Sequence, residues 1–209
     1  MPFTPMNVSV QHTDLFPTRL WIFDLVELAP HFPAWRTALA RLREQSPSPA
    51  GRSNRGGWNS DKKIFDDPLF AALRATSQRA FSHAFLQTDP KANFSFRVEA
   101  WANIHDSGGY NLYHLHQNVL LSGCFYLSTP EGSGDLVLRD PRPGVQLSPF
   151  TGKGANANQL ARVAPRAGML VVFPNWLEHA VDPNNAPSAR VSIAMNALSA
   201  PAAAALAPQ

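Results

Sequence analysis

Hydrophobic and polar positions divide this 209-residue chain into a first part with strand, helix and loop patterns and a second part of short strands. Residues 14–28 are rich in strand-forming residues, which predicts an opening strand. Residues 33–45 carry apolar side chains at helical spacing, and Pro33 suits the first turn of that helix. Residues 46–60 are rich in Pro, Ser, Gly and Asn, which predicts a loop.

The remaining pattern predicts one more helix and then a β-rich core. The helix is expected to begin at Pro68 with Asp67 as its N-cap, and to end before Asp89. From residue 94 onward, turn signals separate about eight short strands, which are predicted at residues 94–103, 110–116, 119–127, 134–139, 159–163, 168–173, 179–181 and 189–198. Strands at this spacing indicate a mainly β jelly roll or a related double sheet, with the two helices packed on it.

The length suits one domain over residues 1–199. Residues 14–93 supply its N-terminal strand and helices, and residues 94–199 its jelly-roll core. The Pro-, Gly- and Asn-rich stretch 143–158 is expected to be a long mobile loop at the barrel mouth. The Ala-rich end, residues 200–209, predicts a flexible tail.

Composition narrows the class of protein. With 44% apolar and only 16% charged residues the chain can bury a core, and its net charge of +3 is scattered, which argues against nucleic-acid binding. The one cysteine, Cys124, allows no intrachain disulfide and reads as a small buried hydrophobe. Without a signal peptide or membrane-length apolar run, we expect a cytoplasmic protein with no membrane partner. The early strand and first helix could form a homodimer interface.

Histidines supply the candidate chemistry. His114 and His116 lie two residues apart in a predicted strand, so both side chains point to one face and can meet one metal ion. His179 follows a buried strand 63 residues after His116 (179 − 116). With a late arginine, Arg190, this set suggests a mononuclear iron oxygenase that binds an oxo-acid, although His116 could instead orient substrate or accept a proton. The other histidines are expected to be ordinary surface or interfacial residues: His12, His31, His83 and His105.

Arg190 is expected on the inner face of the barrel, where a guanidinium needs an anionic partner. A bound dicarboxylate would supply that partner, and a salt bridge to a protein carboxylate is the alternative. Ser192 shares the face of Arg190, and Tyr126 on an inner strand could add its phenol. The neighbourhood of the substrate is assigned from loop position to Asn111, Trp58 and Asn59. Trp58 suits either a lid or pocket wall, or an anchor that fixes the loop to the core.

Several segments, in order along the chain, resemble one known family. They are residues 15–18, 53–60, 101–104, 109–116, 121–127, 140–142, 173–181 and 190–196. They resemble the 2-oxoglutarate- and Fe(II)-dependent oxygenases with a prolyl-4-hydroxylase-like double-stranded β-helix. The resemblance implies His114 and His179 as iron ligands, with His116 where better-studied relatives carry aspartate. It places Arg190 against the far carboxylate of 2-oxoglutarate and Tyr126 near the same group.

The resemblance implies an oxidoreductase that uses Fe(II), 2-oxoglutarate and O2 to oxidise, most simply to hydroxylate, a C–H bond. The substrate would be a small molecule or an amino-acid-like compound. Two alternatives stay open, namely a three-histidine dioxygenase that does not use 2-oxoglutarate and a non-catalytic metal-binding barrel. The sequence leaves open the substrate itself, and whether desaturation or halogenation replaces hydroxylation.

Overall fold

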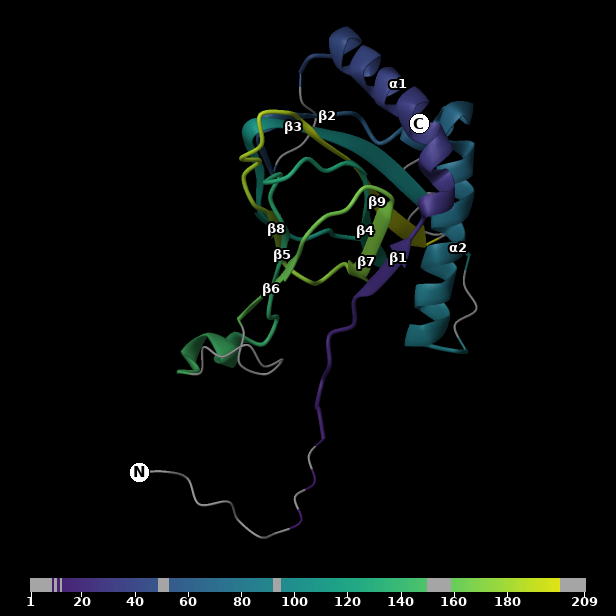
Figure 1. The fold of residues 1–209 in the computed structure, drawn as a ribbon. Coiled ribbons are helices and arrows are strands. Elements are labelled where there is room, and N and C mark those ends of the chain that lie inside the picture. The colour runs from purple at the N-terminus through teal and green to yellow at the C-terminus, as the bar shows by residue number, and fades with distance from the viewer. Residues whose placement is uncertain are drawn as a thin grey trace.

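A curled antiparallel sheet with two helices on one side forms the body of the protein (Figure 1). This computed structural model describes residues 9, 11, 13–48, 53–91, 95–149 and 159–199. Within these residues the sheet has nine strands in the order β1-β7-β4-β9-β3-β8-β5-β6, with β2 paired to β3. The strands are β1 Trp21–Asp24, β2 Asn54–Asn59, β3 Phe96–His114, β4 Leu121–Ser128, β5 Leu136–Arg139, β6 Leu160–Val163, β7 Met169–Pro174, β8 His179–Val181 and β9 Arg190–Ser199.

Both predicted helices are confirmed. The long helices are α1 Phe32–Gln45 and α2 Ala71–Thr88, and short 3-10 turns cover η1 Val26–His31, η2 Ile64–Asp66, η3 Pro68–Phe70 and η4 Pro143–Leu147. Asp67 caps η3, the turn that leads into α2, and its carboxylate accepts a hydrogen bond of 2.8 Å from the backbone N–H of Leu69. Proline suits the start of this turn because its missing N–H would have had no partner there.

The long strand β3 links the two walls of the barrel. Its first half, Phe96–His105, pairs with β9, and its second half pairs with β8 at Asn111 and His114. Between these halves, Gly108 has φ of +82°, a conformation that other residues rarely adopt. The turn expected at residues 106–109, between the predicted strands 94–103 and 110–116, is therefore wrong as a chain reversal. These residues instead bend one continuous strand from one wall to the other.

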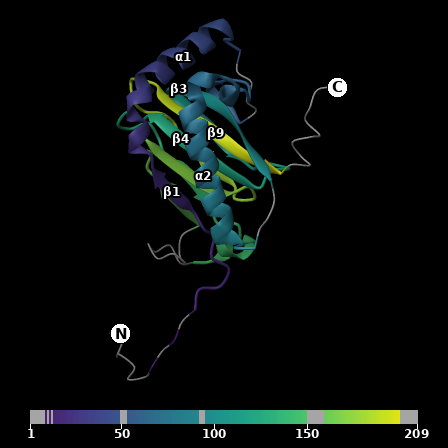
Figure 2. The same ribbon diagram turned by 90° about the vertical axis from the view of Figure 1, so that its right-hand side faces the viewer.

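The helices cover only the outer face of the sheet (Figure 2). Alternate residues of β4 and β9, such as Phe125, Ile193 and Met195, are fully buried in an apolar cluster with Trp35 of α1 and Phe81 of α2. Because side chains alternate along a strand, the intervening residues of the same strands face the inside of the barrel. Many of these inward residues are polar, so the barrel has an apolar outer layer and a polar interior.

The jelly-roll architecture, a double-stranded β-helix with two helices packed on the sheet, is confirmed, and a second local expectation is wrong. The predicted loop 46–60 contains strand β2, which is antiparallel to β3. Most of the predicted mobile loop, residues 150–158, and the tail 200–209 lie outside the described residues. The division of the chain into one domain with these boundaries stays a prediction.

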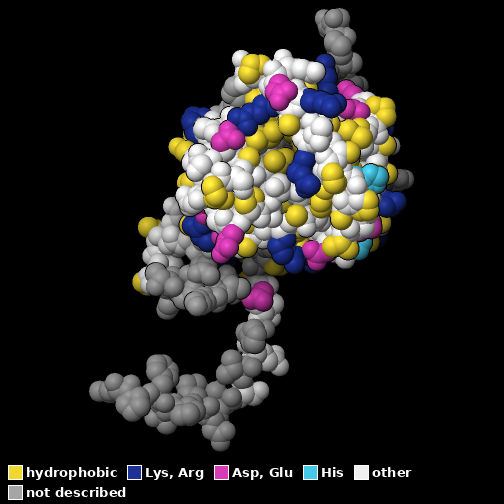
Figure 3. Space-filling model, turned by 45° about the horizontal axis from the view of Figure 1, so that its top comes forward, with side chains coloured by type: hydrophobic (Ala, Val, Ile, Leu, Met, Phe, Trp, Pro, Cys, Tyr) yellow, Lys and Arg dark blue, Asp and Glu magenta, His cyan; other side chains and the backbone are white. Residues whose placement is uncertain are grey.

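Charges of both signs are mixed on the surface shown in Figure 3. Lys and Arg side chains lie singly or beside acidic ones on this face, with no continuous basic patch in view. Two ion pairs at the surface join Arg43 to Asp106 and Arg162 to Asp182. In the described part of the chain, no helix combines the length and the apolar character that crossing a membrane requires.

Candidate functional site

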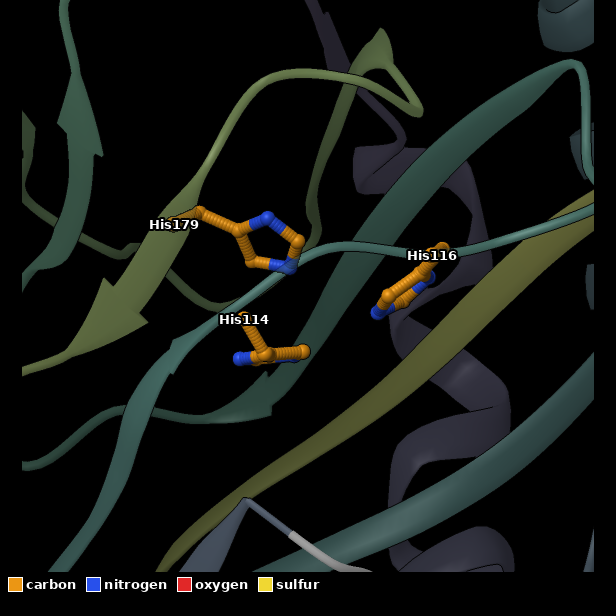
Figure 4. A group of neighbouring side chains, drawn as sticks. All are labelled: His114, His116 and His179. Carbon is orange, nitrogen blue, oxygen red and sulfur yellow. The ribbon is translucent and has the colours of Figure 1, made fainter.

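Three imidazoles meet at one point inside the barrel (Figure 4). His114 is the last residue of β3, and His179, the first of β8, is its direct partner in the sheet. His116 lies two residues beyond the end of β3. Ring centroids are 4.2 Å apart for His114 and His179, 5.2 Å for His114 and His116, and 5.0 Å for His116 and His179. One nitrogen from each ring lies within 4.8 Å of the other two, a spacing that one metal ion can bridge.

Backbone hydrogen bonds fix the tautomer of two of these rings. Nδ1 of His114 lies 2.7 Å from the carbonyl oxygen of Leu112, and Nδ1 of His179 lies 2.9 Å from that of Leu177. Because a carbonyl oxygen only accepts, each Nδ1 carries the proton and donates it. Nε2 of each ring therefore keeps its lone pair, which is the atom that a metal ion needs.

The third ring is held by side chains. Nδ1 of His116 lies 2.6 Å from Oδ1 of Asn196 and 3.0 Å from Oγ of Ser122. The Ser122 hydroxyl donates to the same Asn196 oxygen at 3.0 Å. His116 Nδ1–H donates to this oxygen as well, so its Nε2 also remains free. All three candidate ligands thus present the same ring atom.

Burial keeps these imidazoles neutral. It lowers the pKa of His116 to about 4 and that of His179 to about 3, and it also lowers the pKa of His114. The charge of each ring on the others lowers the pKa of His116 and His179 further. Metal ions and protons compete for the same nitrogen lone pair. At neutral pH, therefore, protons do not block this cluster.

The histidines line a cavity of about 680 Å³ that occupies the barrel interior. Its walls follow from strand register, because β3 and β9 are paired and their inward residues alternate. The polar side chains along these walls come from β2, β3 and β9, and they include Asn59, Asn103, Asn111, Arg190 and Ser192. The volume falls within the range of ordinary small-molecule sites, about 300–1,000 Å³.

Arg190 is the one arginine of the described residues in this lining, and only 1% of it is exposed. Its Nε and Nη1 have no hydrogen-bond partner among the described residues, and neither has the hydroxyl of fully buried Tyr126. The guanidinium carbon lies 5.3 Å from the centre of the Tyr126 ring. The alternative of a salt bridge is not found in the described part of the chain. A buried cation is unfavourable alone, so this corner fits a bound anion.

His105 was expected at the surface, and that expectation is wrong. It is 1% exposed, lines the cavity, and is the direct cross-strand partner of Arg190. Burial lowers its pKa to about 4, and the charge of Arg190 lowers it further, so the ring is neutral. Extending the period-two alternation from Asn103 through this position would have placed it on the inner face. The turn predicted at residues 106–109 hid that signal. His31 and His83 are exposed as expected, and His12 lies outside the described residues.

The residues assigned to the substrate region separate into two groups. Asn59 and Asn111 line the cavity, and Asn111 donates a hydrogen bond of 2.9 Å to Ser53. Trp58 does not line it. It is 2% exposed in the cluster beneath the helices, and its indole N–H donates to the carbonyl oxygen of Ser46 at 2.6 Å. Because Trp58 and Asn59 are neighbours on one strand, they face opposite sides, and Trp58 anchors the chain.

Two carboxylates near the histidines are engaged elsewhere. Glu178 pairs with Arg139 at 2.6 Å. Asp140 accepts hydrogen bonds from the backbone N–H and the side chain of Arg142, which engage it in its own turn. In the described residues the cluster is therefore formed by imidazoles alone.

Comparisons with known proteins agree with this geometry. Residues 99–196 match the family model described as "Putative 2OG-Fe(II) oxygenase". This segment contains all three clustered histidines, Tyr126 and Arg190. No curated protein matches the chain in sequence.

Solved structures with the same fold include several oxygenases. A prolyl-4-hydroxylase from Pseudomonas putida superposes with a TM-score of 0.64 at 16% identity, covering 87% of this chain and 92% of that one. A prolyl hydroxylase from Trichoplax adhaerens, in complex with a hypoxia inducible factor peptide, gives 0.64 at 14% identity, with 90% and 87% covered. HygX from Streptomyces hygroscopicus, with nickel and 2-oxoglutarate bound, gives 0.60 at 13% identity, with 88% and 84% covered.

At these identities the structural matches establish the fold, and the family model adds the class of enzyme. Members of the class are oxidoreductases that use Fe(II), 2-oxoglutarate and O2. Residues 99–196 therefore match the 2-oxoglutarate- and Fe(II)-dependent oxygenase family, and the chain has the double-stranded β-helix fold of these enzymes.

Proposed function

We propose that this protein hydroxylates a C–H bond of a small-molecule or amino-acid-like substrate at a three-histidine iron site. The balanced reaction consumes substrate, 2-oxoglutarate and O2, and yields hydroxylated substrate, succinate and CO2. The observation that carries the proposal is the convergence of His114, His116 and His179 with every Nδ1 already bonded, in one cavity with an unpaired buried arginine. Each feature fits one of the two small ligands that the reaction needs.

The residues fit Fe(II) through three Nε2 atoms. Imidazole is a suitable ligand for ferrous iron, and three ligands on one side leave further positions open. When bound, the iron supplies dioxygen activation and the oxidising power for the C–H bond. The protein holds the rings in place: His114 and His179 are tied to backbone carbonyls, and His116 is tied to Asn196. These bonds prevent the rings from rotating or changing tautomer.

The part of the cavity around Arg190 fits the distal carboxylate of 2-oxoglutarate. Arg190 offers two unpaired nitrogens, Nε and Nη1, and each can donate a charge-assisted hydrogen bond to a carboxylate. The unpaired Tyr126 hydroxyl and the hydroxyl of buried Ser192 add neutral donors beside it. His105, which is neutral and lies next to Arg190, is a further polar group around this carboxylate site. Together these groups would hold the distal carboxylate of the cosubstrate.

The wall that carries Asn59, Asn103 and Asn111 is assigned to the substrate. Asn59 donates a hydrogen bond to Asn103, and both side chains are buried at the cavity surface. Carboxamides offer donors and acceptors at once, so this wall suits a substrate with hydroxyl, amide or amino groups. That preference agrees with an amino-acid-like compound and disfavours a purely apolar one.

Purified protein reconstituted with Fe(II) without oxygen, then given O2 and 2-oxoglutarate, tests the proposal. Succinate is followed against a panel of amino acids, small peptides and cell extracts, and products are examined for a gain of one oxygen atom. We expect succinate formation that depends on 2-oxoglutarate and rises with a true substrate. His179→Ala should abolish iron binding and succinate formation, whereas His83→Gln, which changes an exposed histidine outside the cavity, should keep both. Succinate formation unaffected by His179→Ala would refute the proposed site.

A further inference from the structure

A hydrogen-bonded chain of side chains connects His116 to a buried carboxylate. His116 Nδ1–H donates to Asn196 Oδ1 at 2.6 Å, and Asn196 Nδ2–H donates to Glu99 Oε1 at 3.3 Å. Glu99 is 6% exposed and Asn196 is 3% exposed, so water competes little for either contact. The Asn196 carboxamide thus accepts a hydrogen bond from the imidazole on its oxygen and donates one from its own N–H to the Glu99 carboxylate.

Strand register builds this chain. Glu99 of β3 is the direct partner of Asn196 on β9, and Asn196 is the direct partner of Ser122 on β4. The three side chains therefore lie in one row across the inner face of the sheet. Ser122 donates to Asn196 Oδ1 at 3.0 Å, which holds the carboxamide so that its oxygen faces His116. A row set by three paired strands has little freedom to rearrange.

The row supplies a negative charge, which the clustered histidines lack. The usual iron site of this chemistry has two histidines and a carboxylate, whose negative charge offsets the charge of the metal. Three neutral imidazoles provide no such charge. Glu99 lies two hydrogen bonds from the ring of His116, on the side away from the cluster, and its negative charge acts on that ring.

Lys62 opposes the charge of Glu99 at the edge of the cavity. Its ammonium group donates to Glu99 Oε1 at 2.6 Å, but the lysine side chain is 59% exposed. It also lies 5.2 Å from the ring centre of Trp101, the residue whose ring is tilted against His116 at 5.7 Å. Through space, the charge of Lys62 acts on the His116 ring more strongly than that of Glu99. The influence of Glu99 on His116 therefore depends on the hydrogen bonds through Asn196.

We propose that Glu99, acting through Asn196, replaces the missing ligand carboxylate of this three-histidine iron site. Glu99 and Asn196 are positioning residues. They hold the Nδ1–H tautomer of His116, direct its Nε2 toward the metal and make that nitrogen a stronger donor. The inference rests on the proposed function, because it assigns a role to residues one and two steps behind a proposed ligand.

Fe(II) affinity, measured by competition with a coloured chelator under anaerobic conditions, tests the charge directly. Glu99→Gln keeps the size and one acceptor but removes the charge, and we expect Fe(II) binding about 10–100-fold weaker. Lys62→Gln removes the opposing charge, and we expect binding as tight as wild type or tighter. Asp106→Asn, which neutralises a half-exposed carboxylate of the same strand paired with Arg43, should have no effect. Thermal unfolding of the metal-free proteins verifies that each variant folds.

A rescue experiment separates charge from packing. In the double variant Glu99→Gln with Asn196→Asp, the carboxylate stands at position 196 instead of position 99. It can there accept the hydrogen bond from His116 Nδ1–H directly. We expect Fe(II) affinity to recover to at least the wild-type value, and the visible spectrum of the Co(II)-substituted protein to return toward that of wild type. Asn196→Leu, which can neither accept nor relay, should weaken binding at least as much as Glu99→Gln.

Three outcomes would overturn the inference. They are wild-type affinity in Glu99→Gln, equal weakening in Lys62→Gln and Glu99→Gln, and failure of the double variant to recover. Each is distinct from failure of the proposed function, in which the wild-type protein itself neither binds Fe(II) nor forms succinate. If the wild type does both, the variants judge the role of Glu99 alone.

Discussion

Replacing Arg190 with methionine separates cosubstrate binding from folding and from iron binding. Methionine has a similar length and no charge, so the substitution removes the guanidinium while filling much of its space. In the described residues, Nε and Nη1 of Arg190 bond to no protein group. The substitution therefore leaves no buried carboxylate without its partner. Removing an unpaired buried cation should leave the free energy of unfolding of the ligand-free protein unchanged or higher.

The loss in cosubstrate affinity follows from the same two atoms. Each hydrogen bond between charged groups contributes about 1.5–3 kcal/mol. Two of them amount to about 3–6 kcal/mol, which corresponds to 2-oxoglutarate binding weaker by about two to four orders of magnitude. Iron affinity should change by less than about threefold, because Arg190 is absent from the metal cluster. The effect should thus fall on one ligand alone.

Calorimetric titration of 2-oxoglutarate into the anaerobic Fe(II) protein measures the affinity for the cosubstrate, and chelator competition measures the affinity for iron. Urea unfolding of the ligand-free protein measures the free energy of unfolding. Two results would refute the reasoning. One is an equal loss of iron and 2-oxoglutarate binding in Arg190→Met, which would mean a general collapse of the site. The other is a large loss of stability without ligands, which would mean that the guanidinium has a structural partner.

The remaining predictions concern His105, Gly57 and Trp58. The pKa of His105 is about 4 when folded and about 6.5 when unfolded, so the unfolded state takes up the proton first as pH falls. The stability that the neutral ring contributes is therefore fully present above pH 6.5 and is lost as the pH falls toward 4. The unfolding free energy of the ligand-free protein declines between pH 7.5 and pH 5, and His105→Gln should make that decline smaller by about 2 kcal/mol. A decline as large as that of wild type would contradict a buried neutral ring. In Gly57→Ala the new Cβ would lie 2.5 Å from Cδ2 of His105 and 2.9 Å from the carbonyl oxygen of Ile104, so we expect about 1–3 kcal/mol of destabilisation and weaker 2-oxoglutarate binding; wild-type values of both would show that the strands separate freely. Trp58→Phe should lower unfolding free energy through lost packing and the lost bond to Ser46, and leave the KM for substrate unchanged; a raised KM with normal stability would return Trp58 to the pocket.

Local patterns carried much of the fold prediction. Helix α1 and the cap of the turn before α2 depend on apolar spacing and on the Asp67-Pro68 pair, which act over one or two turns of chain. The alternation rule also predicted that the side chains of His114 and His116 share a face. In the structure β3 ends at His114, yet both rings still point to the same cluster.

Interactions between distant strands decided what the sequence missed. The bend in β3 depends on Gly108 and on the switch of its partner from β9 to β8, and only that pairing shows that residues 106–109 continue the strand. The same register buries His105 beside Arg190. The edge pairing of β2 with β3 likewise turned an expected loop into a strand, which sent Trp58 outward and Asn59 inward.

The sequence by itself determined the residue types of the candidate site and the separation of the two near histidines, because these depend on composition and on the fixed period of a strand. Only the tertiary structure decided which polar side chains stand behind the site. Glu99, Asn196 and Ser122 are widely separated in sequence, and they meet because three strands pair in one register. That register follows from burial of the apolar outer face against the helices. The free-energy gain of this burial is spread over the whole sheet, so the sequence of a single segment does not predict it.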